Sequence, residues 1–211
     1  MRYLVVILLV WIGVCKGYAQ DYETDFREAQ RLFQERAKST QTHLQDYLQD
    51  YPYTPYSDEV HLMQGVLYVE KEKYKQAHKA FQKVEVKNLA RSSESMYYFY
   101  LGYANLQQEE YKKALSCMQK LKDKQNPYFL QATYYTGYCH YKQQNYQQAL
   151  VEFLTLEEVG GYDKIAPYYV VQIYYAFGQY DKNYERAEEL LKKYTENDYK
   201  AELHRMMGEI Y

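Results

Sequence analysis

Small residues recur at a nearly constant interval along most of the chain. Gly65, Gly102 and Gly137 follow one another at this interval, Val171 stands at the next such position, and Gly208 at the one after it. The interval is about 35 residues, a length typical of helical-hairpin repeats. It indicates one supersecondary unit repeated in tandem, and this restricts the chain to an architecture of stacked units.

Two further residue types recur at fixed distances from the glycines. A tyrosine stands nine residues after each of the first three glycines and an alanine twelve residues after it, namely Tyr74 and Ala77, Tyr111 and Ala114, and Tyr146 and Ala149. After Val171 we expect the same pair four residues late, at Tyr184 and Ala187, with the extra residues in a longer turn over residues 177–183. Each unit is therefore predicted to be a helix, a turn and a second helix.

The apolar residues of a unit follow a helical period. In residues 97–108 and 111–121 they recur every three or four positions, and this gives each helix one broad apolar face. Two short helices cannot bury both faces alone. The units are therefore predicted to stack into an all-α solenoid whose core runs from one repeat to the next.

These residues resemble the tetratricopeptide repeat family. The second unit matches at Leu101, Gly102, Tyr111, Ala114 and Leu115, the third at Gly137, Tyr146, Ala149, Leu150 and Phe153, and the first at Gly65, Tyr74, Ala77 and Phe81. The chain departs from the family at Val171, which replaces the glycine, and at Met118 and Leu191, which replace an aromatic residue. The resemblance covers about residue 21 to the end. It implies a right-handed superhelix of stacked antiparallel helix pairs.

A divergent helix pair is expected before the repeat array. Residues 26–36 and 43–51 are similar to the opening repeat of exported envelope tetratricopeptide proteins of the BamD and YbgF type. Pro52 and Pro55 cannot continue a helix, so they place a break after this pair. The predicted organisation is a signal peptide at 1–19, the divergent pair at 20–56 and the array at 57–211, with units at about 57–91, 92–126, 127–162 and 163–197 and a partial unit at 198–211.

The last segment is predicted to be a first helix that lacks its second helix. In residues 199–211 an apolar stripe of Leu203, Met206, Met207 and Ile210 would be left half covered. Repeat arrays normally end in a helix with a polar outer face. We therefore expect either a longer natural repeat protein or a partner that covers this end. The alternative is a natural capping helix.

The first residues have the composition of an export signal. Arg2 supplies positive charge, residues 4–14 form an uninterrupted apolar run, and Gly17 and Ala19 are small residues where a signal peptidase cuts. The run is too short to span a bilayer, which takes about 20 residues. We expect cleavage before Gln20 and an exported protein in the periplasm or at the outer membrane. The alternative is a lipoprotein signal with an acylated Cys15, and this is the one route to a membrane tether.

Charge and reactive residues argue against catalysis and nucleic-acid binding. Of 26 basic and 28 acidic residues, Arg2 and Lys16 fall within the signal, which leaves a net charge of -4 and no basic excess. No phosphate loop, zinc-protease motif or nucleophile elbow occurs, and no cofactor or metal is predicted. The adjacent acids at 157 and 158 are interpreted as ordinary surface residues. Cys117 and Cys139 are interpreted as buried thiols rather than a disulfide.

Tyrosine is unusually frequent, with 30 residues. If the register of the family holds, side chains three residues before, one after and four after each glycine line a concave surface. The partner-binding residues predicted on it are Phe99, Tyr103, Tyr134, Tyr138, Tyr141, Tyr168, Gln172 and Tyr175. Tyrosine offers a large rigid apolar area with a hydroxyl at its tip, which suits an interface. The alternative is that these rings only seal the inside of a tight superhelix.

These features together predict a binding protein. We expect an exported scaffold in the bacterial cell envelope that holds a partner protein or peptide in the aromatic groove. Chaperone-binding members of the family carry Lys, Asn and Arg at these positions for a terminal carboxylate, so a peptide segment without a charged terminus fits better here. Carbohydrate also stacks on aromatic faces and stays open. The functional alternatives are a structural subunit of an envelope assembly and the N-terminal repeat region of a longer regulatory protein.

Overall fold

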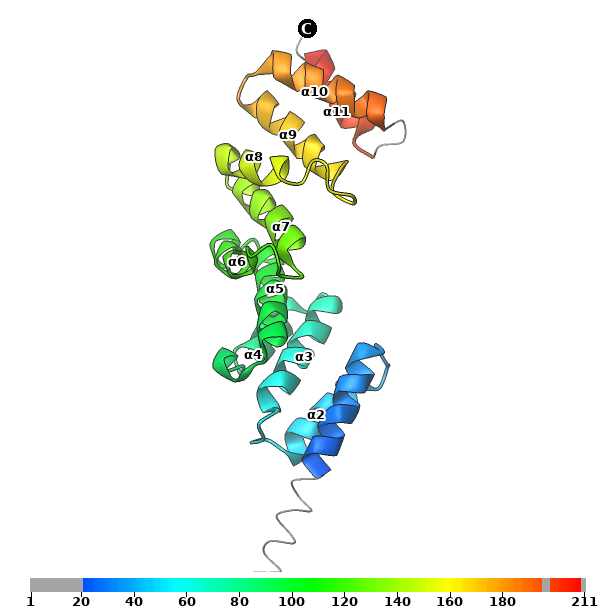
Figure 1. Cartoon of the computed structure of the whole chain (residues 1–211), viewed down its shortest axis with the longest axis vertical. Helices are drawn as coiled ribbons and strands as arrows, with labels where there is room; N and C mark the ends of the chain where they lie inside the picture. The colour runs from blue at the N-terminus through cyan, green and yellow to red at the C-terminus, as the bar shows by residue number, and fades with distance from the viewer. Residues whose placement is uncertain (1–20, 195–197, 210–211) are drawn as a thin grey trace, which may run out of the picture. The chain divides into compact units, whose positions relative to one another are not determined.

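The computed structural model describes residues 21–194 and 198–209, and every regular element in these two ranges is helical (Figure 1). The predicted signal peptide, residues 1–19, lies outside the described residues. Contacts divide the chain into two compact units, Met1–Tyr100 and Leu101–Tyr211. The prediction of an all-α fold built from helix pairs is confirmed.

The first unit contains two helix pairs and the start of a third. Residues 21–34 are helical, and they are followed by α2 (Thr40–Asp50), α3 (Ser57–Glu70), α4 (Tyr74–Phe81), the short 3-10 helix η1 (Val86–Asn88) and the residues of α5 (Arg91–Gln107) up to Tyr100. Helix α3 packs against both α2 and α4. Leu44, Leu62 and Phe81 are fully buried between these helices. At the first pair, the rings of Phe26 and Tyr56 stack with their centroids 4.1 Å apart.

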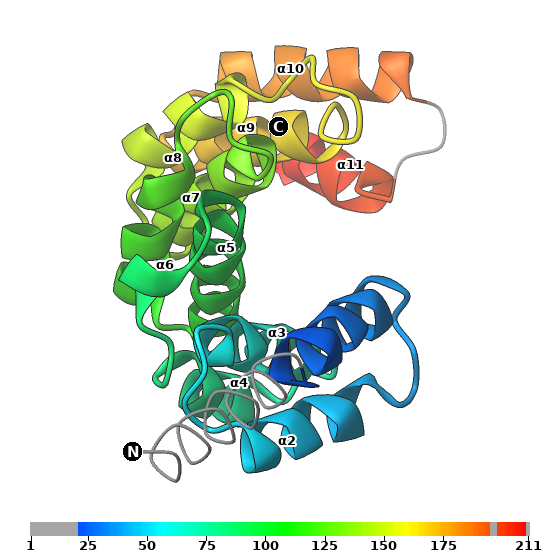
Figure 2. The same cartoon turned by 60° about the horizontal axis from the view of Figure 1, so that its bottom comes forward.

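The second unit continues the same pattern. After the end of α5 it contains α6 (Tyr111–Met118), the 3-10 helix η2 (Gln119–Leu121), α7 (Phe129–Lys142), α8 (Tyr146–Leu154), α9 (Ile165–Ala176), α10 (Tyr180–Lys193) and α11 (Lys200–Glu209). Each helix from α6 to α10 packs against the next one, and α11 contacts both α10 and α9 (Figure 2). Phe153, Leu156 and Ile173 are fully buried in the centre of this stack.

One turn geometry joins the two helices of each pair. Three residues separate α3 from α4, α5 from α6, α7 from α8 and α9 from α10. The middle residue of each turn has a positive φ, and the next N–H bonds to the carbonyl five residues earlier; the middle residues are Glu72, Glu109, Gln144 and Gly178. Arg36 adopts the same conformation after the helix over 21–34. This hydrogen-bond pattern satisfies carbonyls that a helix end leaves without partners.

The longer turn predicted after Val171 is wrong. Helix α10 begins at Tyr180, nine residues after Val171, which is the spacing found after each glycine. Asn183 therefore takes the position of the repeated alanine. It is fully buried and donates a hydrogen bond from its side-chain amide to the carbonyl of Val171 at 2.8 Å. The prediction failed because Tyr184 and Ala187 repeat the expected pair of residues one turn later in the same helix.

The first three repeated glycines each face a larger residue on the second helix of their own pair. These partners are Phe81 for Gly65, Met118 for Gly102 and Phe153 for Gly137. A Cβ atom at Gly65 would lie only 2.3 Å from the ring of Phe81. In the fourth pair the larger residue of the contact lies on the first helix and the smaller one on the second. Val171 stands at the glycine position and Ala187 at the position of its partner, and both are fully buried in one cluster. The larger residue at 171 is therefore matched by a smaller residue at 187. Ala187, and not the predicted Leu191, stands where the family has an aromatic residue.

Candidate functional site

Seven of the eight predicted partner-binding residues belong to the second unit. Tyr103 lies near the end of α5, and its ring meets that of Tyr135 edge to face, 5.4 Å between centroids. The other six lie on α7 and α9, are all partly exposed, and are called the tyrosine face below: Tyr134, Tyr138, Tyr141, Tyr168, Gln172 and Tyr175. Phe99 belongs to the first unit, where its ring contacts Tyr100.

Hydrogen bonds connect the two helices of the tyrosine face. The hydroxyl of Tyr141 on α7 donates to Oε1 of Gln172 on α9. The amide nitrogen of Gln172 in turn donates to the hydroxyl of Tyr168 at 2.5 Å. Tyr168 and Gln172 are four residues apart on one helix and so share one side of it. Because Gln172 uses both ends of its amide, the three side chains hold one another in fixed orientations.

A further tyrosine, Tyr169, packs against the hydrophobic core and contacts two rings of the tyrosine face. The ring of Tyr169 stacks on Phe153, with centroids 4.6 Å apart and an interplanar angle of 7°. It is arranged edge to face with the rings of Tyr141 and Tyr138, with centroids 5.1 and 6.1 Å apart. Burial raises the pKa of Tyr169 well above its usual value, so the hydroxyl stays protonated. Tyr169 was not among the predicted residues, although tyrosine also stands two residues before Gly102 and Gly137 and this recurrence is a signal for it.

Helix α11 borders the tyrosine face with charged residues. The hydroxyl of Tyr175 donates to Glu209 at 2.8 Å. Arg205 pairs with both Glu202 and Glu209, and its hydrogen bonds to these carboxylates raise the pKa of its guanidinium. The guanidinium of Arg205 is therefore held by a carboxylate on each side. Within this network of Arg205, Glu202 and Glu209, two carboxylates surround one cation, so the three side chains together carry one negative charge.

Residues of this border were also absent from the sequence prediction. Tyr199, which directly precedes α11, stacks on Tyr168 with ring centroids 4.0 Å apart and an interplanar angle of 16°. Applied to Gly208, the rule of three positions before and one after the glycine selects Arg205 and Glu209. The glycine spacing therefore contains a signal for these residues, but the predicted set covers only the units before Gly208.

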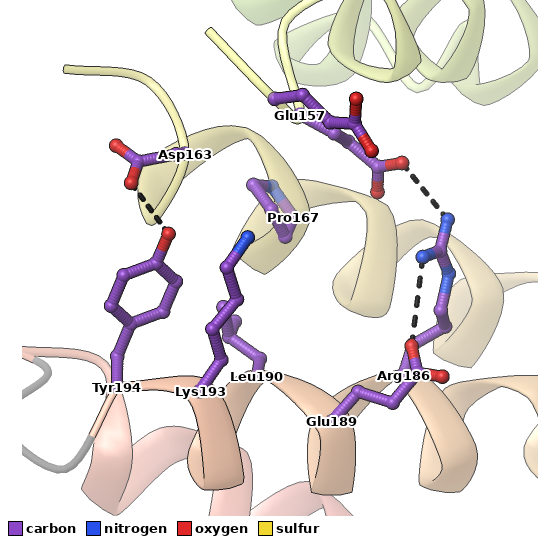
Figure 3. Close-up of a pocket in the computed structure, with 9 residues that line it drawn as sticks. Glu157, Asp163, Pro167, Arg186, Glu189, Leu190, Lys193 and Tyr194 are labelled. Atoms are coloured by element: carbon purple, nitrogen blue, oxygen red, sulfur yellow. Dashed lines mark hydrogen bonds and ion pairs between the residues drawn. The ribbon is translucent and has the colours of Figure 1, made fainter. Parts of the chain in front are cut away.

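A pocket lies elsewhere in the second unit, between the segment after α8, the start of α9 and α10 (Figure 3). It is lined by Glu157, Glu158, Asp163, Pro167, Arg186, Glu189, Leu190, Lys193 and Tyr194. The interpretation of Glu157 as an ordinary surface residue is wrong. Its side chain is only 17% exposed and accepts a hydrogen bond from Arg186 at 2.9 Å. The two residues are 29 positions apart in the chain, and only the stacking of the repeats brings them together.

The two cysteines of the second unit are the remaining candidate reactive groups among the sequence predictions. Cys117 and Cys139 are free and buried, as predicted. Burial raises the pKa of Cys117 to about 11 and that of Cys139 to about 12. Within residues 21–194 and 198–209, no group of three or more His, Cys, Asp and Glu is placed to hold a metal ion. None of the helices in these ranges has the length and apolar character needed to cross a membrane.

Solved structures of known proteins share this fold. A tetratricopeptide repeat protein from Parabacteroides merdae ATCC 43184 matches with a TM-score of 0.68 and 20% identity, over 90% of this chain and 74% of its own. MamA matches with a TM-score of 0.67 and 16% identity, over 87% and 96% of the two chains. YrrB, described as a tetratricopeptide repeat protein with an unusual peptide-binding site, matches with a TM-score of 0.66 and 18% identity, over 83% and 91%.

Sequence comparison agrees with the structural likeness. Residues 62–128 match the family model described as tetratricopeptide repeat. No curated protein matches the chain. The matched residues include six of the repeat positions identified above, namely Gly65, Tyr74, Ala77, Gly102, Tyr111 and Ala114. Proteins of this family are generally non-catalytic scaffolds that bind protein or peptide partners. The comparisons therefore show tetratricopeptide repeats at residues 62–128 and, over most of the chain, the fold of tetratricopeptide repeat proteins.

Proposed function

We propose that this protein is a scaffold that binds a partner protein or peptide through the tyrosine face. The observation that carries the proposal is the hydrogen-bonded row Tyr141–Gln172–Tyr168, set among partly exposed tyrosine rings. Because these side chains are already fixed by one another, little side-chain entropy is lost when a partner binds. Partly exposed, rigid aromatic residues are also those that contribute most to protein interfaces.

The chemistry of the face favours an uncharged peptide segment. Its six residues present aromatic rings, hydroxyls and one amide, and none of them is a lysine or arginine. Arg205 at the border is held between Glu202 and Glu209, and the ammonium of Lys142 lies 5.9 Å from the centre of the Tyr138 ring. Binding of a terminal carboxylate would therefore disturb contacts that these cations already make. An extended or helical segment with apolar side chains can pack on the rings and bond to the hydroxyls.

The proposed location is the bacterial cell envelope. The support is the sequence of residues 1–19, which has the charged start, apolar run and small residues of a secretory signal. The intact mass of the protein recovered from the envelope tests this proposal. A mass that begins at Gln20 supports soluble export, and an acylated Cys15 supports a membrane tether. A mass that retains Met1 would contradict both.

Partner capture tests the binding proposal. Tagged protein is incubated with envelope extract, and the proteins captured by the wild type are compared with those captured by Tyr138→Ala/Tyr141→Ala. Truncating an interface residue that carries binding energy costs about 1 kcal/mol or more, and tyrosine is enriched among such residues, so we expect a loss of at least about fivefold per residue. Tyr53→Ala is the matched control, because this tyrosine is 97% exposed and lies in the first unit.

Partner capture by the double variant can be compared with the wild type only if the variant is folded. Tyr138 and Tyr141 contact Tyr169, so circular dichroism and thermal denaturation of the double variant are measured first. Gln172→Ala provides a second test, because it removes the central hydrogen bonds and leaves the rings in place. Capture that is unchanged in both folded variants would show that the tyrosine face is not the binding surface.

A further inference from the structure

The pocket of Figure 3 is separate from the tyrosine face, since the two share no residue. Its apolar part consists of Leu190 on α10 and Pro167 on α9. Its charged part consists of the carboxylates of Glu157, Glu158, Asp163 and Glu189 and the cations of Arg186 and Lys193. Two negative charges of the lining therefore have no counter-charge within it.

Both cations of the pocket are already engaged. Arg186 donates to Glu157 at 2.9 Å and lies 3.7 Å from Glu189, as the dashed lines in Figure 3 show. The ammonium of Lys193 lies 5.3 Å from the centre of the Tyr194 ring, within the range of a cation–π contact. An anionic ligand would have to displace one of these contacts, and it would also meet the surplus of carboxylates.

The carboxylates have remaining capacity to accept hydrogen bonds. Oε1 of Glu157 has no hydrogen-bond partner but almost no contact with solvent, so the carboxylates that a ligand can reach directly are the exposed ones of Glu158 and Glu189. Asp163 accepts a hydrogen bond from the hydroxyl of Tyr194 at 2.5 Å. This bond holds the pKa of Asp163 below its usual value, so the group is negatively charged at neutral pH. The exposed Glu158 adds a further negative charge at the same pocket.

We propose that this pocket holds a basic side chain, lysine or arginine, of a partner protein. Such a side chain has an aliphatic stem, which can pack on Leu190 and Pro167, and a cationic end that can reach the carboxylates. A metal ion fits less well, because no group of three or more ligands converges on one point among the described residues. The proposal goes beyond the tyrosine face and does not depend on it, because different residues carry it.

The test uses a pair of short peptides that differ only in charge. The probe is acetyl-Gly-Arg-Gly-amide, and its control replaces arginine with citrulline, which has nearly the same shape but no charge. Each is titrated into the uniformly 15N-labelled protein at low ionic strength, and amide shifts are followed by NMR. We expect saturable shifts for amides of the pocket, such as those of Glu189 and Tyr194, with the arginine peptide only.

Variants then identify the groups that bind. Glu158→Gln and Glu189→Gln should each weaken binding of the arginine peptide by up to about fivefold, which is the range of a single exposed ion pair. Glu185→Gln, an exposed acid on α10 outside the pocket, is the matched control and should leave the affinity unchanged. Equal shifts with the citrulline peptide, or full affinity in the Glu158→Gln/Glu189→Gln variant, would overturn the proposal.

Discussion

Replacing Gly65 with alanine is expected to destabilise the protein, even though alanine is the better helix former. Gly65 lies inside α3, and a Cβ atom there would lie 2.3, 2.6 and 2.8 Å from three ring carbons of Phe81. Non-bonded carbon atoms prefer to be about 3.5–4.0 Å apart. The ring would have to retreat by roughly 1 Å. Phe81 is only 1% exposed, so it has little free space to enter.

Two opposing terms set the size of the effect. Exchanging glycine for alanine inside a helix stabilises it by about 1 kcal/mol. Forcing an extra methyl group into a packed core costs about 1–3 kcal/mol, and the short distances to a rigid ring place this site near the upper end. The net expectation is a loss of about 2 kcal/mol in the free energy of unfolding. For a chain of this length such a loss lowers Tm by about 4–8 °C.

Thermal and urea denaturation of four variants measure this prediction: Gly65→Ala, Gly208→Ala, Phe81→Leu and Gly65→Ala/Phe81→Leu. Gly208→Ala is the matched control, because no atom lies within 4 Å of the Cβ that it adds, and its stability should equal or exceed that of the wild type. In the Gly65→Ala background, Phe81→Leu should recover part of the loss, since it removes the ring that clashes; a double-mutant cycle isolates this coupling. If Gly65→Ala were as stable as Gly208→Ala, the argument from close helix contact would be refuted.

Three further predictions concern the turn, the exchanged pair and the thiols. Gly178→Ala places a side chain at φ 67° and should cost about 1 kcal/mol of unfolding free energy in urea titrations; an unchanged midpoint would show that the turn tolerates it. Ala187→Phe should clash with Val171 and cost about 1–3 kcal/mol, and Val171→Gly in the same chain should restore part of the stability, whereas additive losses would contradict the exchange of sizes. With pKa values of about 11 and 12, Cys117 and Cys139 remain thiols at mildly basic pH, so alkylation followed by peptide mass spectrometry should be slow in the native protein and fast in urea; equal rates would contradict their burial.

Much of the fold could be predicted from the repeat alone. Glycines at a fixed spacing and apolar residues at a helical period were sufficient for the fold class and for the helix pairs. The fourth pair was misread, because Tyr184 and Ala187 imitate the pattern inside a helix that begins at Tyr180. Local patterns cannot distinguish an insertion in a turn from a substitution in a helix. Burial can, and it shows Asn183 in the position of the repeated alanine.

The candidate site could be predicted only in part. Register placed tyrosines of α7 and α9 on one surface, but it did not reveal the contacts that orient them. The hydrogen bond between Tyr141 and Gln172 joins residues 31 positions apart, and the pair of Glu157 and Arg186 joins residues 29 positions apart. Such contacts form between neighbouring repeats and depend on how closely the repeats stack. A sequence read one repeat at a time contains no direct signal for them.

The exchange of the larger and the smaller residue between positions 171 and 187 restricts how a repeat chain of this kind can recombine during evolution. The bulky and the small member of each tight contact belong to the same hairpin, one on each of its helices. Duplication or recombination of a whole hairpin therefore carries both halves of the fit together. A crossover within a hairpin would instead combine valine with phenylalanine, or glycine with alanine. It would produce a collision in the first case and a void in the second.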